Sequence, residues 1–182
     1  AFGSWTAYHL QRAGQRVALV DAYGPGNARS SSGGQSRVIR MGYGDQEIYS
    51  RWSLRSLEQW KSLLRETGLA TQFQPSGVLW MARERDPLTT KTLETLARLA
   101  IPHERLERKE LEARWPQIDL GPITWAIHEP ESGFLVSFHV VQTVAQMAVA
   151  RGAVYLQESI RPPAGKGELA TVESRSGKAV SA

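Results

Sequence analysis

The sequence contains no cysteine, so disulfide bonds and thiolate metal ligands are excluded within this chain. No apolar run approaches the roughly 18–20 residues that are needed to cross a bilayer. The first residues also lack the basic segment and the apolar core of a secretion signal. The four histidines include no pair at a spacing typical of metal ligands. We therefore expect a cytoplasmic protein with no membrane span and no bound metal.

The charge pattern lacks the clustering that is typical of nucleic-acid binding. The chain has 22 Lys and Arg against 18 Asp and Glu, for a net charge of +4, which favours anionic partners. The basic residues are scattered, however, and acidic residues lie among them, as in residues 83–86 and 104–114. Nucleic-acid-binding proteins usually gather their basic residues into one stripe or patch. We therefore expect no nucleic-acid partner.

The most informative stretch is a loop of small residues followed by two arginines. Residues 30–44 read Ser-Ser-Ser-Gly-Gly-Gln-Ser-Arg-Val-Ile-Arg-Met-Gly-Tyr-Gly, and the small residues allow a ligand to approach the backbone closely. If the run from Arg37 to Arg40 is extended, these two side chains point to opposite faces. One guanidinium could then face a cofactor, and the other could bind a substrate carboxylate through two parallel hydrogen bonds. The alternative is a polar loop with two solvated arginines.

The first 21 residues read as the second half of a βαβ dinucleotide-binding unit. A helix is predicted over residues 3–13 with Gly14 as its stop. The apolar run of residues 16–20 predicts a parallel strand buried on both faces. Asp21 follows this strand, where such units place the acidic residue that binds ribose hydroxyls. Gly3 stands for the third glycine of the Gly-x-Gly-x-x-Gly motif, and the strand and glycines that precede it are missing. A surface aspartate that ends a strand is the alternative for Asp21.

The rest of the chain alternates between helical and strand patterns. Helices are predicted over residues 45–67, from residue 87, over residues 109–114 and over residues 137–151. Strands are predicted over residues 73–82, which pair around a turn at residues 75–77, and over residues 123–128, 134–136 and 153–156, with one arm of a hairpin over residues 168–174. Asp45 and Ser137 are expected to cap their helices, and Pro87 is expected at the first position of its helix. Ile48 and Trp52 are expected on the core-facing side of the first long helix.

Four stretches together resemble a known family. They are residues 1–10 (AFGSWTAYHL), residues 20–23 (VDAY), residues 34–40 (GQSRVIR), and residues 114–116 (RWP) with residues 129–133 (EPESG). Over most of its length, and in the same order, the chain resembles the flavin-dependent amine and amino-acid oxidoreductases of the D-amino-acid oxidase superfamily. The resemblance is greatest to the branch of sarcosine oxidase and N-methyltryptophan oxidase. The Arg-x-x-Arg stretch is the most specific of the four.

The resemblance implies FAD as the cofactor and gives a role to each matching residue. The expected cofactor-binding residues are Gly3 and Ser4 at the pyrophosphate, Asp21 at the adenosine ribose with Ala22 next to it in the sequence, Ser32, Gly33 and Ser36 along the flavin, Arg37 against the flavin ring system, and Arg161, with Ile160, near the adenine. Arg40 is expected to pair with the substrate carboxylate. Arg37 and Arg40 are therefore the candidate catalytic residues.

The implied fold class is α/β. It is a Rossmann-like FAD-binding domain, with its first strand missing, interrupted by a mixed α+β substrate-domain insertion. Residues 1–70 are expected to be the FAD-binding part, and residues 71–136 the insertion, in which the Glu129-Pro130 stretch belongs to the substrate layer. Residues 137–182 are expected to return to a truncated FAD-binding domain.

The implied reaction is the oxidation of a secondary or N-methylated amino acid. A hydride equivalent passes from the carbon next to nitrogen to the flavin, and the resulting imine hydrolyses. A cation near the flavin and another at the carboxylate suit this chemistry, because the ring gains negative charge. The expected partners are an amino-acid-like small molecule and O₂ or another electron acceptor. Sarcosine oxidases carry histidines just before the Arg-x-x-Arg stretch, where this chain has Ser32-Gly33, so the sequence argues against sarcosine itself as the substrate.

Three other functions remain compatible with parts of the sequence. An NAD(P)-binding dehydrogenase shares the ribose-binding acid but gives the stretch from Ser30 to Arg40 no role. A non-catalytic, basic binding module that kept a nucleotide fold is the second alternative. The third is a chain with the family fold that is inactive by itself.

Overall fold

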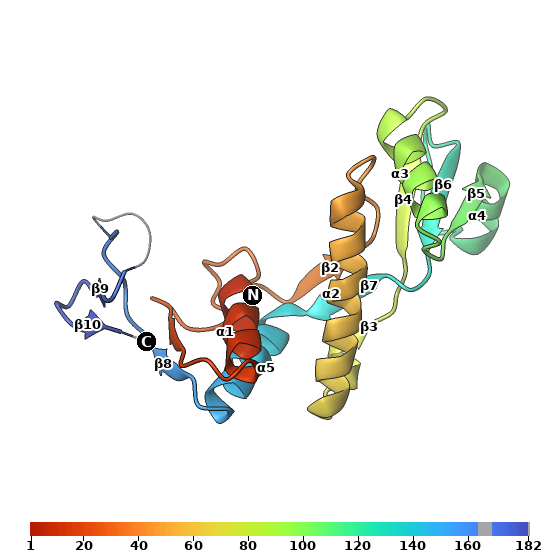
Figure 1. Cartoon of the computed structure of the whole chain (residues 1–182). Helices are drawn as coiled ribbons and strands as arrows, with labels where there is room; N and C mark the ends of the chain where they lie inside the picture. The colour runs from red at the N-terminus through yellow and green to blue at the C-terminus, as the bar shows by residue number, and fades with distance from the viewer. Residues whose placement is uncertain (164–168, 182) are drawn as a thin grey trace. The chain divides into compact units, whose positions relative to one another are not determined.

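The computed structural model describes residues 1–163 and 169–181, and these form two compact units of mixed α/β structure (Figure 1). The first unit comprises Ala1–Arg37 and Val136–Ala182, and the second comprises Val38–Leu135. The chain passes between the units within strands β2 (Ser36–Ile39) and β7 (Gly133–Val136). The sequence-based division placed residues 38–70 with the nucleotide-binding part, whereas here they pack within the second unit.

Two helix–strand pairs form the body of the first unit. Helix α1 (Phe2–Arg12) leads into β1 (Ala18–Val20), and α5 (Ser137–Ala150) leads into β8 (Val154–Leu156). The strands pair in parallel, and α1 packs against α5. Helix α5 is apolar on most of its surface, packs against α1, and buries five small apolar side chains. They are Val140, Val141, Val144, Ala145 and Ala148.

The strand β1 is parallel, as predicted, but it is not buried on both faces. All three of its residues are only partly buried, and β8 is its only strand partner in the described part of the chain. One face of the pair borders a cavity of about 690 Å³ whose lining includes Val17, Val154 and Leu156. The apolar run therefore marks a strand that the described residues cover on one side only.

Strands β9 (Val172–Glu173) and β10 (Ala179–Val180) form a short antiparallel pair at the end of the first unit. The hairpin arm expected over residues 168–174 begins at a position outside the described residues. From residue 172 onward it is confirmed as an arm of this pair.

The second unit is built around a three-stranded antiparallel sheet. Its order is β4 (Val78–Ala82), β6 (Trp125–Glu129) and β5 (Glu104–Glu107). Its helices are α2 (Glu47–Glu66), the short 3₁₀ helix η1 (Ala70–Gln72), α3 (Pro87–Arg98) and α4 (Arg108–Arg114). Leu106, Leu111 and Ala126 are fully buried and join β5, α4 and β6 into one apolar cluster. Helix α3 begins with Pro87 after Asp86, whose carboxylate accepts from the Thr89 amide (2.9 Å).

The predicted pairing of strands within residues 73–82 is wrong. Strand β3 (Phe73–Gln74) pairs with β7 in the sheet ordered β2-β7-β3, and β4 pairs with β6. The two segments thus form a long antiparallel ribbon that bends at residues 75–77, where the strand pairing is interrupted because Pro75 cannot donate to the ladder. At the bend the Gly77 amide donates to the Ser132 carbonyl (3.0 Å).

Helix α2 differs from expectation at its start. Asp45 makes no capping bond and instead pairs with Lys91 of α3 (2.7 Å). Ile48 and Trp52 are 48% and 61% exposed, whereas the core contacts come from the later turns around Leu57 and Leu64. Likewise, Ser137 does not cap α5: it is the first helical residue, and its hydroxyl donates to the Ser32 carbonyl.

Glu47 bridges helices α2 and α3, and this bridge predicts a pH-dependent stability. Its carboxylate pairs with Arg51 (2.6 Å) and Arg98 (3.0 Å), and hydrogen bonds from these two arginines lower the pKa of Glu47 from its ordinary 4.5. A carboxyl group with a lowered folded-state pKa contributes stability above its unfolded pKa, and the contribution is lost as the pH falls through the folded value. Glu47→Gln should therefore lower the thermal midpoint slightly at pH 7, because the pairs are exposed, and not at strongly acidic pH.

The control is Glu58→Gln, which makes the same change at an exposed position of the same helix. Equal effects of the two substitutions on the thermal midpoint at pH 7 would contradict the role of the bridge.

Candidate functional site

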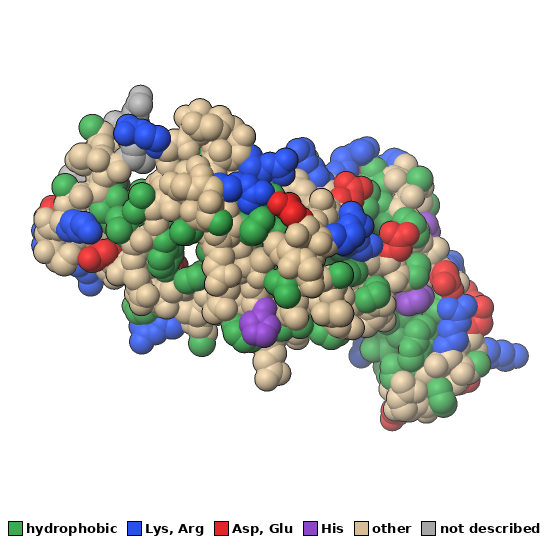
Figure 2. Space-filling model, turned by 90° about the horizontal axis from the view of Figure 1, so that it is seen from below, with side chains coloured by type: hydrophobic (Ala, Val, Ile, Leu, Met, Phe, Trp, Pro, Cys, Tyr) green, Lys and Arg blue, Asp and Glu red, His purple; other side chains and the backbone are tan. Residues whose placement is uncertain are grey.

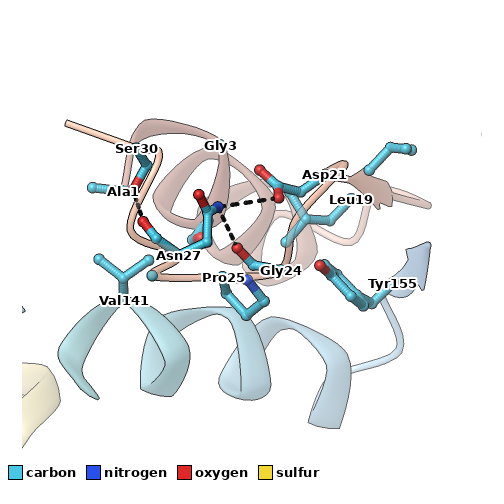
Figure 3. A pocket seen from close by; sticks show the side chains of 13 residues that line it. Ala1, Gly3, Leu19, Asp21, Gly24, Pro25, Asn27, Ser30, Val141 and Tyr155 are labelled. Carbon is cyan, nitrogen blue, oxygen red and sulfur yellow. Dashed lines mark hydrogen bonds between the residues drawn. The ribbon is translucent and has the colours of Figure 1, made fainter. Parts of the chain in front are cut away.

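Asp21 lies directly after β1, at the carboxyl end of the parallel strand pair. Its amide donates to the Leu156 carbonyl (3.1 Å), which extends the ladder by one residue. Its Oδ1 accepts from the Tyr23 amide (2.8 Å) and from Nδ2 of Asn27 (3.5 Å), as Figure 3 shows for Asn27. The other carboxylate oxygen makes no hydrogen bond to any residue that the structure describes. Asp21 is therefore held in place through one oxygen and has the second available.

A cavity of about 100 Å³ lies beside Asp21 (Figure 3). The start of α1 contributes Gly3 and Ser4 to its lining, α5 contributes Val141, and β8 contributes Tyr155. The first amide groups of a helix have no partners within the helix and carry a partial positive charge. This end of the cavity is thus suited to an anionic group such as a phosphate.

A second cavity, of about 400 Å³, shares Val20 and Asp21 with the first. Its lining includes Ala22, Ile160 and Arg175. Asp21 therefore lies where the two cavities meet, and a ligand that occupied both would pass its carboxylate.

The loop of residues 24–35 is fixed to the start of α5. The Ser137 hydroxyl donates to the Ser32 carbonyl, and the Ser137 amide donates to the Gln35 carbonyl (3.0 Å). Ser32 Oγ accepts from the amino group of Ala1 (3.2 Å). Gly33 lies so close to the preceding turn that a Cβ there would come within 2.2 Å of the Asn27 carbonyl oxygen. The glycine is therefore required by the path of the chain.

Arg37 follows this loop and folds back onto it. Its Nε donates to the Ser31 carbonyl (2.6 Å), and one terminal nitrogen donates to the Ser36 carbonyl (2.9 Å). The side chain is exposed in the first unit. It is held on the loop that the resemblance assigns to the flavin.

Arg161 does not line either cavity. Its guanidinium pairs with Glu173 (3.3 Å), and its amide donates to the Glu173 carbonyl (2.8 Å). The side chain thus supports the bridge of residues 158–161 to β9. Within this part of the first unit, Arg175 is the arginine that reaches the cavity lining.

Arg40 belongs to the second unit, whereas Arg37 belongs to the first. The surroundings of Arg40 are therefore those of the second unit alone. Its guanidinium carbon lies 4.5 Å from the ring centroid of Trp80 and 4.5 Å from that of Tyr43. One terminal nitrogen donates to the Gly42 carbonyl. Cation–π contacts of this kind attract the guanidinium to the ring faces.

Sequence reasoning missed Asn27, Tyr155 and Arg175 at the cavities and Trp80 beside Arg40, and it assigned Glu129 to the substrate layer without a contact. Asn27 stands in a stretch that the sequence identifies only as a turn, and its amide bonds to Asp21 and to the Gly24 carbonyl (2.7 Å). Tyr155 looks like any aromatic residue of a short strand. The register that places it opposite Leu19 depends on the pairing of two distant segments, and that pairing has no local signal.

The polar groups that line the first cavity fit part of a dinucleotide. The Tyr155 hydroxyl is buried and has no hydrogen-bond partner among the described residues, and Figure 3 shows it turned toward the first cavity. An unpaired buried hydroxyl is rare in proteins and suggests a ligand or water that completes its bonding. With the helix start on one side and the Asp21 carboxylate on the other, this donor set fits a phosphate followed by a ribose.

Gly33→Ala is predicted to disrupt the loop, because the added methyl group would meet the Asn27 carbonyl oxygen at 2.2 Å and the Ser30 carbonyl oxygen at 3.0 Å. Overpacking at such contacts typically costs about 1–3 kcal/mol in the free energy of unfolding, measured by urea denaturation. Ser31→Ala is the control, since Ser31 is exposed and its bond to Arg37 uses its backbone carbonyl. A Gly33→Ala protein as stable as the control would show that the close approach is incorrect.

The phenol of Tyr155 is predicted to lose its proton at a higher pH than that of an ordinary tyrosine. Burial raises the pKa of its phenol above 10.0, and the negative charge of Asp21 raises it further. The folded state therefore keeps its proton where the unfolded state loses it. The resulting contribution to stability is complete below about pH 10 and is lost as the pH rises through the folded-state pKa.

Titration followed by near-ultraviolet absorbance should show one tyrosine that ionises late, at a higher pH than the others, and Tyr155→Phe should remove this step. Tyr23→Phe is the control, at a 55% exposed position, and should leave the step in place. A late step that persists in Tyr155→Phe would contradict the assignment. Because an unpaired buried hydroxyl costs about 1–3 kcal/mol, Tyr155→Phe should not destabilise the ligand-free protein.

The chain is similar to known proteins in both sequence and fold. The chain is 33% identical over 157 residues to monomeric sarcosine oxidase of Bacillus sp. (strain B-0618). This aligned region covers 86% of this chain and 40% of that protein. The chain is 27% identical over 150 residues to N-methyl-L-tryptophan oxidase of Yersinia pestis (strain Pestoides F), covering 82% of this chain and 40% of that protein. The chain thus spans about two fifths of the length of these relatives.

The fold is similar to that of L-proline dehydrogenase from P. horikoshii, with a TM-score of 0.81 and 21% identity over 98% of this chain and 47% of that one. Among the described residues, no helix is long and apolar enough to cross a membrane. The sequence matches the family described as FAD dependent oxidoreductase (DAO) over residues 1–181. The chain therefore belongs to this family of FAD-dependent oxidoreductases, which confirms the resemblance seen in its motifs.

Proposed function

We propose that the first unit binds FAD, and that the protein uses it to oxidise the C–N bond of a secondary or N-methylated amino acid. The observation that supports this best is the position of Asp21. It lies between two cavities, one of which receives the start of α1 and the other the segment near Ile160. This arrangement suits the order phosphate, ribose, adenine along one extended ligand.

The proposed contacts with FAD follow from the lining residues. The helix start with Gly3 and Ser4 would bind the pyrophosphate. The free oxygen of Asp21 and the Tyr155 hydroxyl would bond to the ribose, which would satisfy the buried phenol. Ala22 and Ile160 would lie along the adenine. Arg161, by contrast, is proposed only to hold this segment through Glu173.

The loop of residues 30–37 is proposed to border the flavin. Ser32, Gly33 and Ser36 of this loop would lie along the flavin. The Arg37 guanidinium donates to the Ser31 and Ser36 carbonyls, and these two hydrogen bonds hold it on the loop. When bound, FAD would supply the acceptor for the hydride equivalent of the substrate. Arg37 would contribute a fixed positive charge that favours added negative charge nearby.

Arg40 is proposed to bind the substrate carboxylate. The names of the similar proteins refer to sarcosine, N-methyl-L-tryptophan and L-proline, and all three molecules are amino acids with a free carboxylate. An arginine bonds such a group through two parallel N–H donors. Because those names include oxidases and a dehydrogenase, both O₂ and another electron acceptor remain within the proposal.

We further propose that the first unit is a Rossmann-like FAD-binding domain without its first strand, and that Val38–Leu135 is the substrate-domain insertion. The support is that this second unit is one continuous segment between the two segments of the first. A basic module for nucleic acid has less support, since Figure 2 shows acidic side chains among the basic ones on the face in view.

The cofactor proposal is tested by adding FAD to the purified chain and recording the absorption spectrum after gel filtration. Flavin bands should stay with the protein, and fluorescence titration should show that Asp21→Asn weakens FAD binding about tenfold or more, because a charge-assisted bond is lost. Asp119→Asn is the control, an exposed position in the second unit. Retention of NAD(P) in place of FAD, or equal affinity of the two variants for FAD, would contradict the proposal.

A further inference from the structure

A buried carboxylate, that of Glu129, joins the segment after β2 to strand β4 within the second unit. The residue is 1% exposed. Its Oε2 accepts from the Met41 amide (2.7 Å) and the Ser132 hydroxyl (2.6 Å), and its Oε1 accepts from the Gly42 amide (2.9 Å) and from Nε1 of Trp80 (2.6 Å). Removing a buried carboxylate from water is costly unless donors surround it, and here four donors do.

The chain places Glu129 there through two local features. Glu129 is the last residue of β6, at the bend of the ribbon, where the strand pairing ends before Pro130. Gly42 has no side chain, and a Cβ at that position would lie 2.9 Å from Oε1 and 2.8 Å from the Trp80 ring. The absent side chain therefore makes room for the carboxylate and the indole.

Two of the three groups that contact the Arg40 guanidinium, the Trp80 ring and the Gly42 carbonyl but not the Tyr43 ring, belong to residues that bond to Glu129. Trp80, whose ring lies against the guanidinium, gives its only N–H to the carboxylate. Gly42, whose carbonyl accepts from Arg40, gives its amide to the same carboxylate oxygen. The Ser53 hydroxyl fixes the Arg40 carbonyl in addition. Nε and the second terminal nitrogen of Arg40 have no hydrogen bond to the described residues.

We propose that Glu129 is a positioning residue for the arginine that binds the substrate. It fixes the Trp80 ring and the Gly42 carbonyl, and these hold one edge and one face of the guanidinium so that the remaining N–H edge is directed to a carboxylate. The carboxylate role of Arg40 rests on the proposed function, whereas the positioning of its side chain does not. An arginine held in this way loses little conformational freedom when it binds, which favours affinity.

The positioning is tested by NMR on the chain, through the Nε–H signal of Arg40, assigned by its loss in Arg40→Lys. Ring currents from Trp80 and Tyr43 should shift this signal away from those of exposed arginines. Glu129→Gln has one acceptor oxygen in place of two and turns an NH₂ group toward backbone donors, so the Arg40 signal should move to the exposed position. Glu131→Gln, an exposed glutamate of the same turn, should leave it unchanged.

Trp80→Phe provides a test that does not depend on the folding of Glu129→Gln. It keeps an aromatic ring and loses the N–H bond, so it should produce part of the same shift. The effects of the two substitutions should not add in the double variant, because both remove one interaction. An Arg40 signal that is the same in wild type and Trp80→Phe would overturn the proposal.

L-Proline, a secondary amino acid added as a carboxylate probe, separates this inference from the proposed function. Wild type should bind it with a further shift of the Arg40 signal, and Glu129→Gln should bind it about tenfold more weakly, with Glu131→Gln unchanged. If wild type does not respond to L-proline while Glu129→Gln still moves the Arg40 signal, the positioning is supported and the carboxylate role of Arg40 is contradicted. If both glutamate variants bind equally, the positioning role is contradicted.

Discussion

The second unit depends on one constraint, which is that the buried carboxylate of Glu129 must be surrounded by donors. Three segments supply these donors, and each is thereby fixed to the end of strand β6: the turn at Met41 and Gly42, strand β4 through Trp80, and the ribbon bend at Ser132. Because polar groups in the interior are costly when unpaired, the bend and the turn cannot move independently. The arginine next to the turn therefore has a defined position.

In the first unit, the binding features come from the ends of regular elements. Asp21 directly follows β1, Gly3 and Ser4 lie in the first turn of α1, and the loop that reaches Arg37 is bonded to the first residue of α5. None of these features requires a large core. The unit instead places polar groups around two joined cavities, which is what a long, partly charged ligand such as FAD requires.

The sequence predicted the helices well, along with the family and the place of Asp21 directly after β1, because glycine stops, proline starts and motifs are local signals. The start of α3 at Pro87 is an example. It failed where distant segments decide the outcome. The strands that pair with residues 73–82 lie about fifty residues further along the chain. Asp45 forms an ion pair with Lys91 of another helix and does not cap its own. Trp52 follows the helical period but lies on a surface that the described residues leave open.

The central claim is that FAD lies along Asp21 in the first unit, and hydrogen exchange with mass spectrometry tests it most directly. Addition of FAD should slow the exchange of backbone amides at the start of α1, in the loop of residues 21–35 and near Ile160. The core strand β6 of the second unit should exchange as before. Protection confined to the second unit, or none in the presence of saturating FAD, would contradict the account.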